Sequence, residues 1–332
     1  MRKLLVLLSV LLVAIVLSAC GGGGAGGGTQ EGPFKVAVVM PSAINDLAFS
    51  QSMYDALIKI QNEMGKENFE IAYSDNLFVV DDAASAIRDY ASQGFDLIIA
   101  HGSQYGASLQ GIAPDFPETS FAWGTAGDTM GLPNVFAYEA YSQEGGYVNG
   151  VMAAALSESN VLGVVGPVEV GDAKLYVDGF IAGAKATKPD IQVNVNYIGS
   201  FSDVALASEA AQTHAEAGAD SLTGTAQMVV GAIGVAQERG IPWFGTQANQ
   251  TSLAPTVVVA CQVYDWTVLL DQMIELIKDG TYGGQAYVVT LENEGLLIEF
   301  NDAYDLPAEV KTLGEQAIQG IKDGSIKVDV AQ

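Results

Sequence analysis

Positively charged side chains and cysteine are both scarce in this chain. Its 332 residues hold 14 lysines and arginines against 39 aspartates and glutamates, a formal net charge of −25. Nucleic acid is therefore not expected as a partner, because binding to phosphates needs clustered cations. The two cysteines, Cys20 and Cys261, are too few for a disulfide framework. Cys261 lies in the apolar run TVVVACQV, which favours a small buried residue over a reactive thiol.

Motifs of catalysis and metal binding are also lacking. The sequence has no G-x-S-x-G elbow, no P-loop, no dinucleotide fingerprint and no spaced Cys/His set. Of its two histidines, His101 ends an apolar run, which favours a hydrogen-bonded cleft histidine over a catalytic base or metal ligand. His214 lies among alanines and acids in a helical stretch and is expected at the surface. We therefore expect no enzyme, no cofactor and no metal.

The first 32 residues have the pattern of an export signal followed by a tether. Arg2 and Lys3 precede a short uncharged apolar run that is typical of a secretory signal over residues 1–19. The letters LSAC, ending at Cys20, resemble the lipobox of bacterial lipoproteins, which implies a lipid anchor on Cys20. An uncleaved anchor helix is the alternative. The glycine tract that follows, to residue 32, is typical of a flexible tether. We expect a protein anchored at the extracytoplasmic face of the cell membrane.

Beyond the tether, short apolar runs alternate with stretches of helical spacing. FKVAVVM, DLIIAHG and VLGVVGP have the composition of strands, whereas Phe49, Met53, Ala56 and Ile60 form an apolar stripe along a helix. Strands and helices in turn predict parallel sheets. The order starts afresh after the run NVFAYEAYSQEGGYVNGVMAAALSES, so we predict an α/β fold with two doubly wound lobes.

Polar and aromatic residues gather where the predicted strands end. In doubly wound sheets the ligand binds outside the carboxyl ends of the strands. The set contains no lysine or arginine, so it suits a neutral, planar, polar ligand better than a carboxylate or phosphate. Its members are Ser42, Asn45, Asp46, Asp75, Asn76, His101, Ser103, Gln104, Tyr105, Trp123, Phe201, Asp203, Thr223, Thr225, Gln227, Gln247, Asn249, Tyr264, Asp265 and Trp266.

Several of these positions, and Phe49 beside them, have a second interpretation. Spacing alone favours Phe49 as the start of the core stripe rather than as a wall of the cleft. Asn45 or Asp46 is placed to cap the helix that begins there. Three residues are open between a structural role and a ligand contact: Trp123, Trp266 and Asp265.

The run INDLAFSQSMYDAL resembles the first signature of the basic membrane protein family, the purine-nucleoside-receptor-like solute-binding lipoproteins of ABC importers. YASQGFDLIIAHGSQY, YEAYSQEGGYVNGVMAAAL, GVVGPVEVGDAKLYVDGFIAGAK, YIGSFSDVALASEAAQTHAEAGAD and IPWFGTQANQ resemble it further, over most of the chain. The resemblance implies a permease partner and a ligand between two lobes, often a purine stacked between two aromatic rings. By position these rings would be Phe49 and Phe201, with Ser50 where the family usually has an asparagine that contacts the base.

The resemblance also implies a type I periplasmic-binding-protein fold, whose lobes are joined by several short hinge strands. On that basis the N-terminal lobe is expected at 33–140 plus 261–291, and the C-terminal lobe at 141–260 plus 292–332. The lobes are expected to close on the ligand.

Departures from the family pattern bear on the ligand. The nucleoside binders have an Asp-x-Asp-Gln run where this chain has QANQ from Gln247, and a lysine near the position of Tyr264. CQVYDW resembles a second branch that binds free bases or unidentified ligands. We therefore expect a purine base or related heterocycle, with a nucleoside binder or a surface ligand sensor as alternatives. The expected contacts are Asn45, Asp46, Phe49, Ser50, Ser103, Tyr105, Trp123, Phe201, Gln227, Gln247, Tyr264, Asp265 and Trp266.

Overall fold

The structure, a computed structural model, describes residues 32–330. The expected signal peptide, the lipid attachment at Cys20 and all of the tether before Gly32 lie outside the described residues. Within the described part, no helix has the length and apolar character that a membrane crossing requires. Residues from Gly32 onward form one compact unit built on two sheets.

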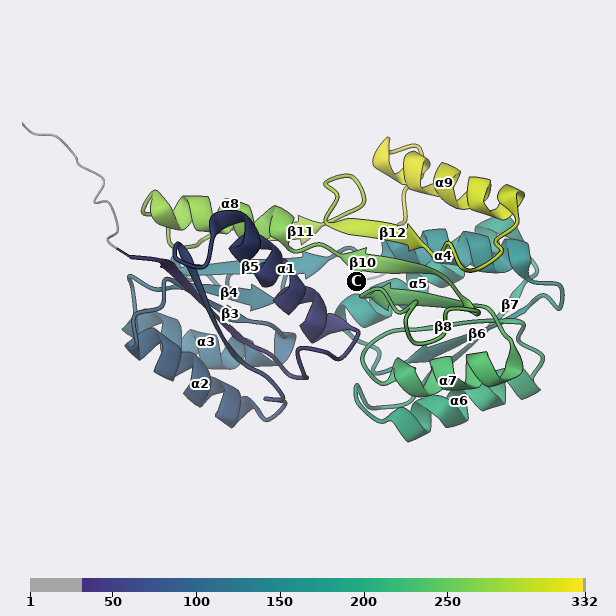
Figure 1. The fold of residues 1–332 in the computed structure, drawn as a ribbon, viewed down its shortest axis with the longest axis horizontal. Helices are drawn as coiled ribbons and strands as arrows, with labels where there is room; N and C mark the ends of the chain where they lie inside the picture. The colour runs from purple at the N-terminus through teal and green to yellow at the C-terminus, as the bar shows by residue number, and fades with distance from the viewer. Residues whose placement is uncertain (1–31, 331–332) are drawn as a thin grey trace, which may run out of the picture. The chain divides into compact units, whose positions relative to one another are not determined.

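The first sheet has six parallel strands in the order β11-β5-β4-β3-β1-β2. Alternate residues of β1 enter different cores: Val36 and Val38 pack with α1 and α8, whereas Ala37 and Val39 pack with α2 and α3. Figure 1 shows these helix pairs on opposite faces of the sheet. We call this sheet and its helices the first lobe. Its elements are β1 (Phe34–Val39), α1 (Phe49–Met64), β2 (Phe69–Ser74), α2 (Val80–Ser92), β3 (Leu97–Ala100), η1 (Ser103–Tyr105), α3 (Gly106–Ile112), η2 (Ala113–Asp115), β4 (Ser120–Gly124), β5 (Val135–Ala140), α8 (Thr267–Lys278) and β11 (Ala286–Val289).

The second sheet, in the order β12-β10-β9-β8-β6-β7, is parallel except for β12, which pairs antiparallel with β10. Helices α6 and α7 cover one face, and α4, α5 and α9 cover the other. We call this sheet and its helices the second lobe. Its elements are α4 (Gln143–Leu156), β6 (Val161–Gly166), α5 (Gly171–Thr187), β7 (Gln192–Tyr197), α6 (Val204–Glu216), β8 (Ser221–Gly224), α7 (Val229–Arg239), β9 (Trp243–Gln247), β10 (Val258–Tyr264), β12 (Leu296–Phe300) and α9 (Ala308–Lys322).

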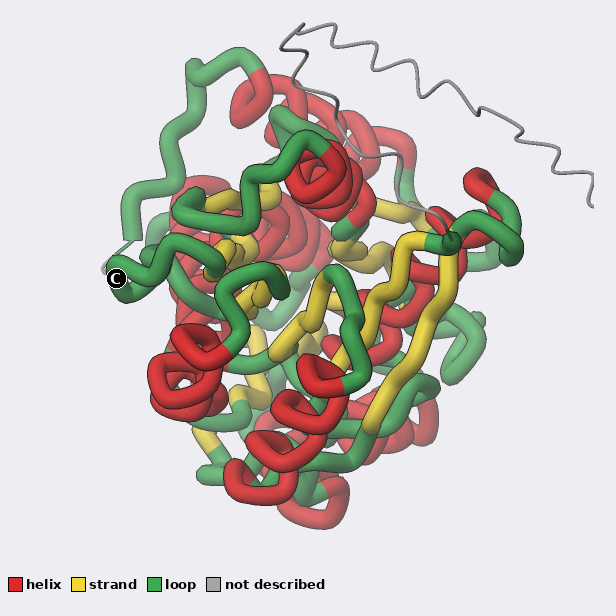
Figure 2. The backbone as a smooth tube through the Cα atoms, turned by 90° about the vertical axis from the view of Figure 1, so that its left-hand side faces the viewer, coloured by secondary structure: helices red, strands yellow, loops and turns green. Residues whose placement is uncertain are grey.

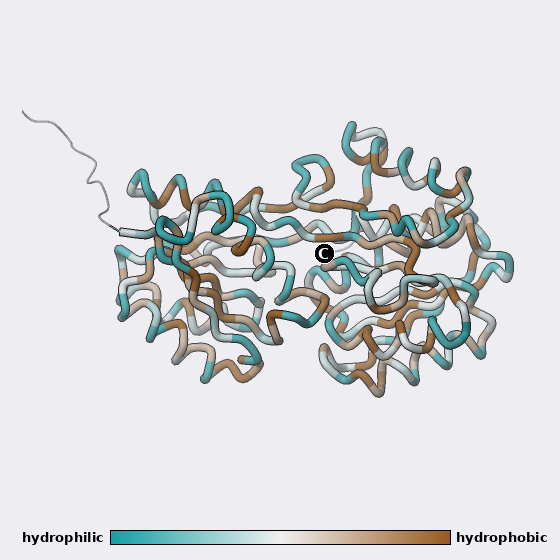
Figure 3. Tube along the Cα trace, viewed as in Figure 1, coloured by the Kyte–Doolittle hydropathy of each residue, from teal (hydrophilic) through white to brown (hydrophobic). Residues whose placement is uncertain are grey.

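The predicted class, two doubly wound and largely parallel sheets, is thereby confirmed. Figure 2 shows the strands between layers of helices, and Figure 3 shows that apolar segments concentrate in the strands while polar segments lie toward the outer turns. Fully buried β-strands read as near-continuous apolar runs because both faces of a parallel sheet are covered. This is why the strands could be recognised in the sequence as apolar runs.

The α4–α5 pair packs backbone against backbone through glycines. A Cβ atom on Gly150 would lie 2.1 Å from the carbonyl oxygen of Phe180, and one on Gly183 would lie 2.0 Å from that of Tyr147. Such distances do not occur between real atoms, so only glycine allows this approach. The letters GGYVNG and GFIAGAK thus encode a close helix contact rather than a turn.

The chain passes between the lobes three times. It leaves the first sheet after Ala140, returns after β10, and crosses again between β11 and β12. The predicted second crossing lies between residues 260 and 261. Strand β10 pairs within the second sheet through Tyr264, so residues 261–264 lie in the second lobe.

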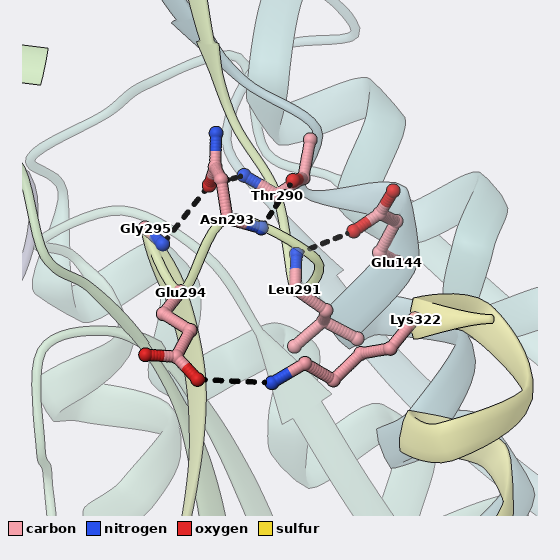
Figure 4. Close-up of polar contacts among 7 residues, drawn as sticks. All are labelled: Glu144, Thr290, Leu291, Asn293, Glu294, Gly295 and Lys322. Carbon is pink, nitrogen blue, oxygen red and sulfur yellow. Dashed lines mark hydrogen bonds and ion pairs between the residues drawn. The ribbon is translucent and has the colours of Figure 1, made fainter. Parts of the chain in front are cut away.

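The last crossing is a short loop that is fastened to the second lobe (Figure 4). Asn293 Oδ1 accepts hydrogen bonds from the backbone N–H groups of Thr290 at 2.9 Å and Gly295 at 3.0 Å. The N–H of Leu291 donates to Glu144 at the start of α4, at 2.7 Å. Lys322 of α9 forms an ion pair of 3.2 Å with Glu294. The loop is therefore attached to α4 and α9 of the second lobe.

His214 is buried, so the prediction of a surface position was wrong. Its side chain is 1% exposed, and Nε2 lies 3.0 Å from the carbonyl oxygen of Val164 in β6. The space exists because Gly163 has no side chain: a Cβ there would lie 2.6 Å from that of His214. Cys261 is buried as predicted, and burial raises the pKa of its thiol to about 12.

Candidate functional site

A cavity of about 280 Å³ lies at the carboxyl ends of the strands of both lobes. This is the position expected for ligands of doubly wound sheets. The first lobe supplies Pro41, Phe49, Phe78, Val80, Gly102, Ser103, Gln104 and Thr125. The second lobe supplies Val170, Gly171, Asp172, Ala173, Phe201, Ala226, Gln227 and Gln247.

Phe49 lines the cavity and is held in place from behind. Its ring stacks on that of His101 with centroids 3.8 Å apart and 10° between the planes, and the edge of Trp266 meets it at 6.3 Å. The same side chain packs against the apolar core. The two interpretations of Phe49 are therefore compatible, since one face is buried and the residue also borders the cavity.

Asp46 fixes the turn that presents Phe49. Its carboxylate accepts hydrogen bonds from the N–H groups of Ala48 at 2.8 Å, Ser50 at 3.2 Å and Gln51 at 3.1 Å. It also accepts one from the Ser42 hydroxyl at 2.5 Å. These N–H groups belong to the start of α1, where they have no partner within the helix. Asp46 thus caps α1, and its acceptor capacity is used within the protein.

His101 is buried beneath Phe49 in a defined tautomer. Nε2 lies 3.0 Å from the carbonyl oxygen of Phe49, and Nδ1 lies 2.7 Å from the Tyr138 hydroxyl. A carbonyl can only accept, so Nε2 carries the hydrogen and Nδ1 accepts from Tyr138. Burial lowers the pKa of His101 to about 3, so the ring is neutral. Both nitrogens are engaged, which leaves no role as a proton acceptor or metal ligand.

Two further rings in the lining come from Phe201 and Phe78. Phe201 follows β7, in the turn that Asp203 closes by accepting from the N–H of Leu206 at the start of α6, at 3.0 Å. Phe78 follows β2 in the first lobe, and its ring centroid lies 6.4 Å from that of Phe201 at an angle of 48°. Phe78 is 52% exposed, which is unusual for so large an apolar side chain. Aromatic rings from both lobes therefore meet at the cavity.

The polar lining is made of hydroxyls, amides and one acid. Ser103, Gln104 and Thr125 come from the first lobe, and Gln227 and Gln247 from the second. Among the lining residues there is no lysine, arginine or histidine. The cavity therefore lacks the cation that a carboxylate or phosphate ligand would require.

Asp172, at the start of α5, is the acid in the lining. The buried hydroxyl of Tyr264 donates a hydrogen bond of 3.2 Å to its Oδ2. Burial raises the pKa of Asp172 to about 6, and hydrogen bonds from Tyr264, Gln247 and nearby backbone N–H groups limit the rise. The carboxylate is thus mostly ionised at neutral pH, in a cavity that contributes no cation.

Three lining residues have a strained backbone conformation. Thr125, Ala226 and Gln247 are not glycines, yet their φ angles are 56°, 75° and 73°. Left-handed conformations of such residues cost roughly 1–3 kcal/mol each and persist where the surroundings fix them, often at functional sites. The side-chain oxygen of Gln247 accepts from the N–H of Ala226 at 3.2 Å, which joins two of the three strained positions. The second-lobe wall is therefore preformed.

The profile of a family described as ABC transporter substrate-binding protein, PnrA-like, matches residues 34–329. The chain belongs to this Bmp family. The resemblance found in the sequence is therefore confirmed, and the family comprises substrate-binding proteins of transporters rather than enzymes.

Two relatives of this Bmp protein have names that state a ligand. A purine-binding protein from Brucella abortus is 27% identical over 296 residues, which cover 89% of this chain and 83% of the relative. An ABC transporter nucleoside-binding protein from Lactococcus lactis is 25% identical, over 89% of this chain and 88% of the relative.

A solved structure confirms the fold. The solute-binding protein of an ABC transporter system from Aeropyrum pernix superimposes with a TM-score of 0.77 at 20% identity, over 89% of this chain and 93% of that protein. The expected type I periplasmic-binding-protein fold is therefore that of this Bmp protein.

Five of the thirteen residues expected to contact ligand line the cavity of this Bmp protein: Phe49, Ser103, Phe201, Gln227 and Gln247. The rest do not line it. Asn45 is exposed, and Asp46 caps α1. Ser50 is buried, with its hydroxyl 2.7 Å from that of Ser42.

The remaining expected contacts lie behind the lining or beside it. Tyr105 is in the core and donates to the Leu77 carbonyl at 2.8 Å, and Trp123 donates to that of Ser103 at 3.3 Å. Tyr264 reaches the cavity only through Asp172. Two further residues serve the crossing after β10. They are Asp265, paired with Lys59 at 2.7 Å and bonded to Thr267, and Trp266, which donates to Ser52 at 2.8 Å.

Sequence reasoning missed Phe78 and Asp172. Phe78 is an aromatic residue in the turn after β2, the same signal that drew attention to Phe49 after β1. Asp172 follows β6, whose carboxyl end was not included among the strand ends that were searched. Applied to VLGVVGP and the residues after it, the same rule would have found Asp172.

Proposed function

We propose that this substrate-binding protein is an extracytoplasmic lipoprotein that binds a purine base or a closely related planar heterocycle and presents it to an ABC permease. The observation that carries the proposal is the cavity lined by rings from both lobes and by amides and hydroxyls, with no cation. Planar faces and hydrogen-bonding edges are what such a lining complements.

The ring walls favour a flat ligand. Phe49 is preset by its stacking on His101, so little side-chain entropy is lost when a ligand stacks on it. Phe201 and Phe78 supply apolar surface from both lobes. Stacking of a base on an aromatic side chain contributes about 1–3 kcal/mol by alanine substitution. Stacking of this kind stabilises a bound purine without any charge.

Closure of the lobes follows from how they are joined. Three crossings connect them, and near the cavity the lobes also meet through the rings of Phe78 and Phe201 and through polar contacts. The amide of Gln250 donates to the Leu47 carbonyl at 3.3 Å, and Lys59 of α1 pairs with Asp265 after β10. An ion pair with an exposed lysine contributes little, about 0–1 kcal/mol, and permits hinge motion. We propose that ligand closes the lobes and that the permease recognises the closed form.

A free base is favoured over a nucleoside by the QANQ segment. Asn249, which stands in place of an acidic residue of the nucleoside binders, does not line the cavity, and its amide donates to Glu299 at 2.5 Å. Gln247 remains as the polar group of this segment in the lining. A nucleoside binder is the second candidate, because one relative is named for nucleosides. A sensor that does not deliver to a permease is the third.

The test is a thermal-shift screen of the purified protein against purine and pyrimidine bases and their nucleosides. A ligand at about 100 times its Kd stabilises by about 2.7 kcal/mol. We expect bases to raise Tm more than nucleosides, and Phe49→Ala or Phe201→Ala to weaken the shift. Tyr73→Ala, an exposed ring outside the cavity, is the matched control. If neither class raised Tm, the purine assignment would fail.

Lipid attachment has its own test. Cys20→Ala should abolish incorporation of labelled palmitate and release the protein from the membrane fraction, whereas Cys261→Ala should change neither. Retention of label in Cys20→Ala would exclude the lipobox interpretation.

A further inference from the structure

Asp172 combines three properties that no other lining residue has. It is acidic, it borders the cavity, and it is positioned by a chain of buried hydroxyls. An acid in the first turn of a helix is stabilised by the helix dipole wherever it lies, so its place on α5 alone says nothing of ligand. The cavity and the hydroxyl chain are the observations that matter.

The hydroxyl chain orients the carboxylate. Ser142, just before α4, lies 2.7 Å from the Tyr264 hydroxyl, which lies 3.2 Å from Asp172 Oδ2. A carboxylate only accepts, so Tyr264 donates to Asp172 and Ser142 donates to Tyr264. Ser142 and Tyr264 are both buried. Asp172 is therefore held from behind by groups that carry no charge.

The groups that hydrogen-bond to the Asp172 carboxylate are all neutral: the Tyr264 hydroxyl at 3.2 Å, the Gln247 amide and nearby backbone N–H groups. An ionised carboxylate has about four acceptor positions, and leaving them without partners away from water is costly. Among its neighbours in the lining, Gln247 can donate, whereas Val170, Ala173 and Phe201 cannot donate from their side chains. No lysine, arginine or histidine lines the cavity. A ligand that brings N–H or O–H donors would therefore stabilise the charge of Asp172 from the cavity side.

We propose that Asp172 selects ligands that present two adjacent hydrogen-bond donors to its carboxylate. The inference rests on the proposed function, since it assumes that the cavity binds a purine compound. Two parts of such compounds have this chemistry: the ring N–H and amino group on the edge of guanine, and the vicinal hydroxyls of ribose. In either case a compound that lacks one of the donors leaves Asp172 incompletely paired.

Matched ligand pairs test the inference. Guanine and hypoxanthine differ by the 2-amino group, and inosine and 2′-deoxyinosine differ by the 2′-hydroxyl. Kd is measured by calorimetry for the purified protein, for Asp172→Asn and for Asp178→Asn, a substitution on the same helix outside the lining. Asn keeps the shape of Asp but replaces one acceptor oxygen by a donor. Thermal melts establish that each variant is folded.

We expect one pair to show at least a tenfold difference in Kd with the unsubstituted protein, and Asp172→Asn to reduce it to about twofold. Asp178→Asn should keep the difference. If Asp172→Asn removes the difference in Kd between guanine and hypoxanthine, the base edge is the partner of Asp172. If it removes the difference between inosine and 2′-deoxyinosine, the partner is the ribose. If the ligands bind and Asp172→Asn leaves both ratios unchanged, the inference is overturned while the proposed function stands. If no compound binds the unsubstituted protein, both are overturned.

Discussion

The two walls of the cavity use their acids in opposite ways. In the first lobe, Asp46 is consumed by backbone N–H groups and the Ser42 hydroxyl, and the wall presents the ring of Phe49. In the second lobe, Asp172 receives a hydrogen bond from Tyr264 behind it and borders the cavity itself. Both acids stand near the start of a helix at the end of a strand. The difference lies in position: Asp46 is outside the lining and stabilises the start of α1, whereas Asp172 is part of the lining.

The largest expected effect concerns His101, behind the first wall. Its folded pKa of about 3 lies below the unfolded value of 6.5, so only the unfolded chain takes up this proton between those values. Stability contributed by neutral His101 is therefore present above pH 6.5 and lost as pH falls. The loss is about 1.4 kcal/mol per pH unit, or about 2.7 kcal/mol by pH 4.5.

Urea unfolding from pH 7.5 to 4.5 measures this loss. His101→Gln, whose amide can donate to Phe49 and accept from Tyr138, should have a shallower dependence on pH. Asn45→Ala, an exposed substitution that removes no titratable group, is the control and should keep the full dependence on pH. An unchanged slope in His101→Gln would contradict the buried neutral ring.

The next largest effect is on the start of α1. Asp46→Ala should lower the free energy of unfolding by about 2 kcal/mol, because it removes the cap of α1 together with the partner of Ser42. The midpoint of urea unfolding measures this. Asn45→Ala, an exposed neighbour, should cost less than about 0.5 kcal/mol. Equal effects of the two substitutions would remove the distinction between the walls.

Truncation of the first wall should act on ligand rather than on the fold. Phe49→Ala is expected to weaken binding of the ligand found by the thermal screen about tenfold, or about 1.4 kcal/mol, because one stacking surface is lost. Calorimetry with Phe49→Ala and Phe49→Tyr measures it. Phe49→Tyr retains the ring and should bind nearly as well, and equally weak binding by both would argue against stacking.

The smallest expected effect is that of Asp172→Asn, which should raise the free energy of unfolding rather than lower it. The folded pKa of Asp172, about 6, lies above its unfolded value of 3.8, so ionising it costs stability. That cost is absent below about pH 4, grows up to pH 6 and is constant above. Asp172→Asn should therefore stabilise the ligand-free protein by about 1 kcal/mol at pH 7.5, an amount reduced for partial exposure to solvent.

The difference in Tm between Asp172→Asn and the unsubstituted protein, followed from pH 7.5 to pH 4, checks this. It should shrink to zero at the acid end. A variant less stable than the unsubstituted protein at pH 7.5 would mean that Asp172 is satisfied within the protein, as Asp46 is.

Much of the fold could be predicted because its signals are local. Apolar runs and helical spacing identified the strands and helices, and their alternation predicted parallel sheets. The antiparallel pairing of β12 with β10 could not be predicted that way, because it joins segments whose contact depends on the whole fold. His214 was misplaced for the same reason, since the space it fills is made by Gly163 on a distant strand.

For the site, the sequence predicts which residues lie at the carboxyl ends of the strands, but not which of these residues line the cavity. Phe49 and Phe201 were found through their place in the family pattern. Tyr264 and Trp266 also stand at a strand end, yet they lie behind the lining, where Tyr264 donates to Asp172 and Trp266 donates to Ser52. Which residue borders the cavity and which supports it depends on how the helices pack.

The glycine contact between α4 and α5 has a mechanical consequence. Ser142 stands where the chain enters α4 from the first crossing, and Asp172 stands at the start of α5. Because backbone touches backbone at the glycines, no side chain lies between the helices there that could absorb a displacement. We therefore expect α4 and α5 to move as one rigid body. If α4 and α5 rotate together about the first crossing, Asp172 moves with them. The position of Asp172 would then depend on the angle between the two lobes.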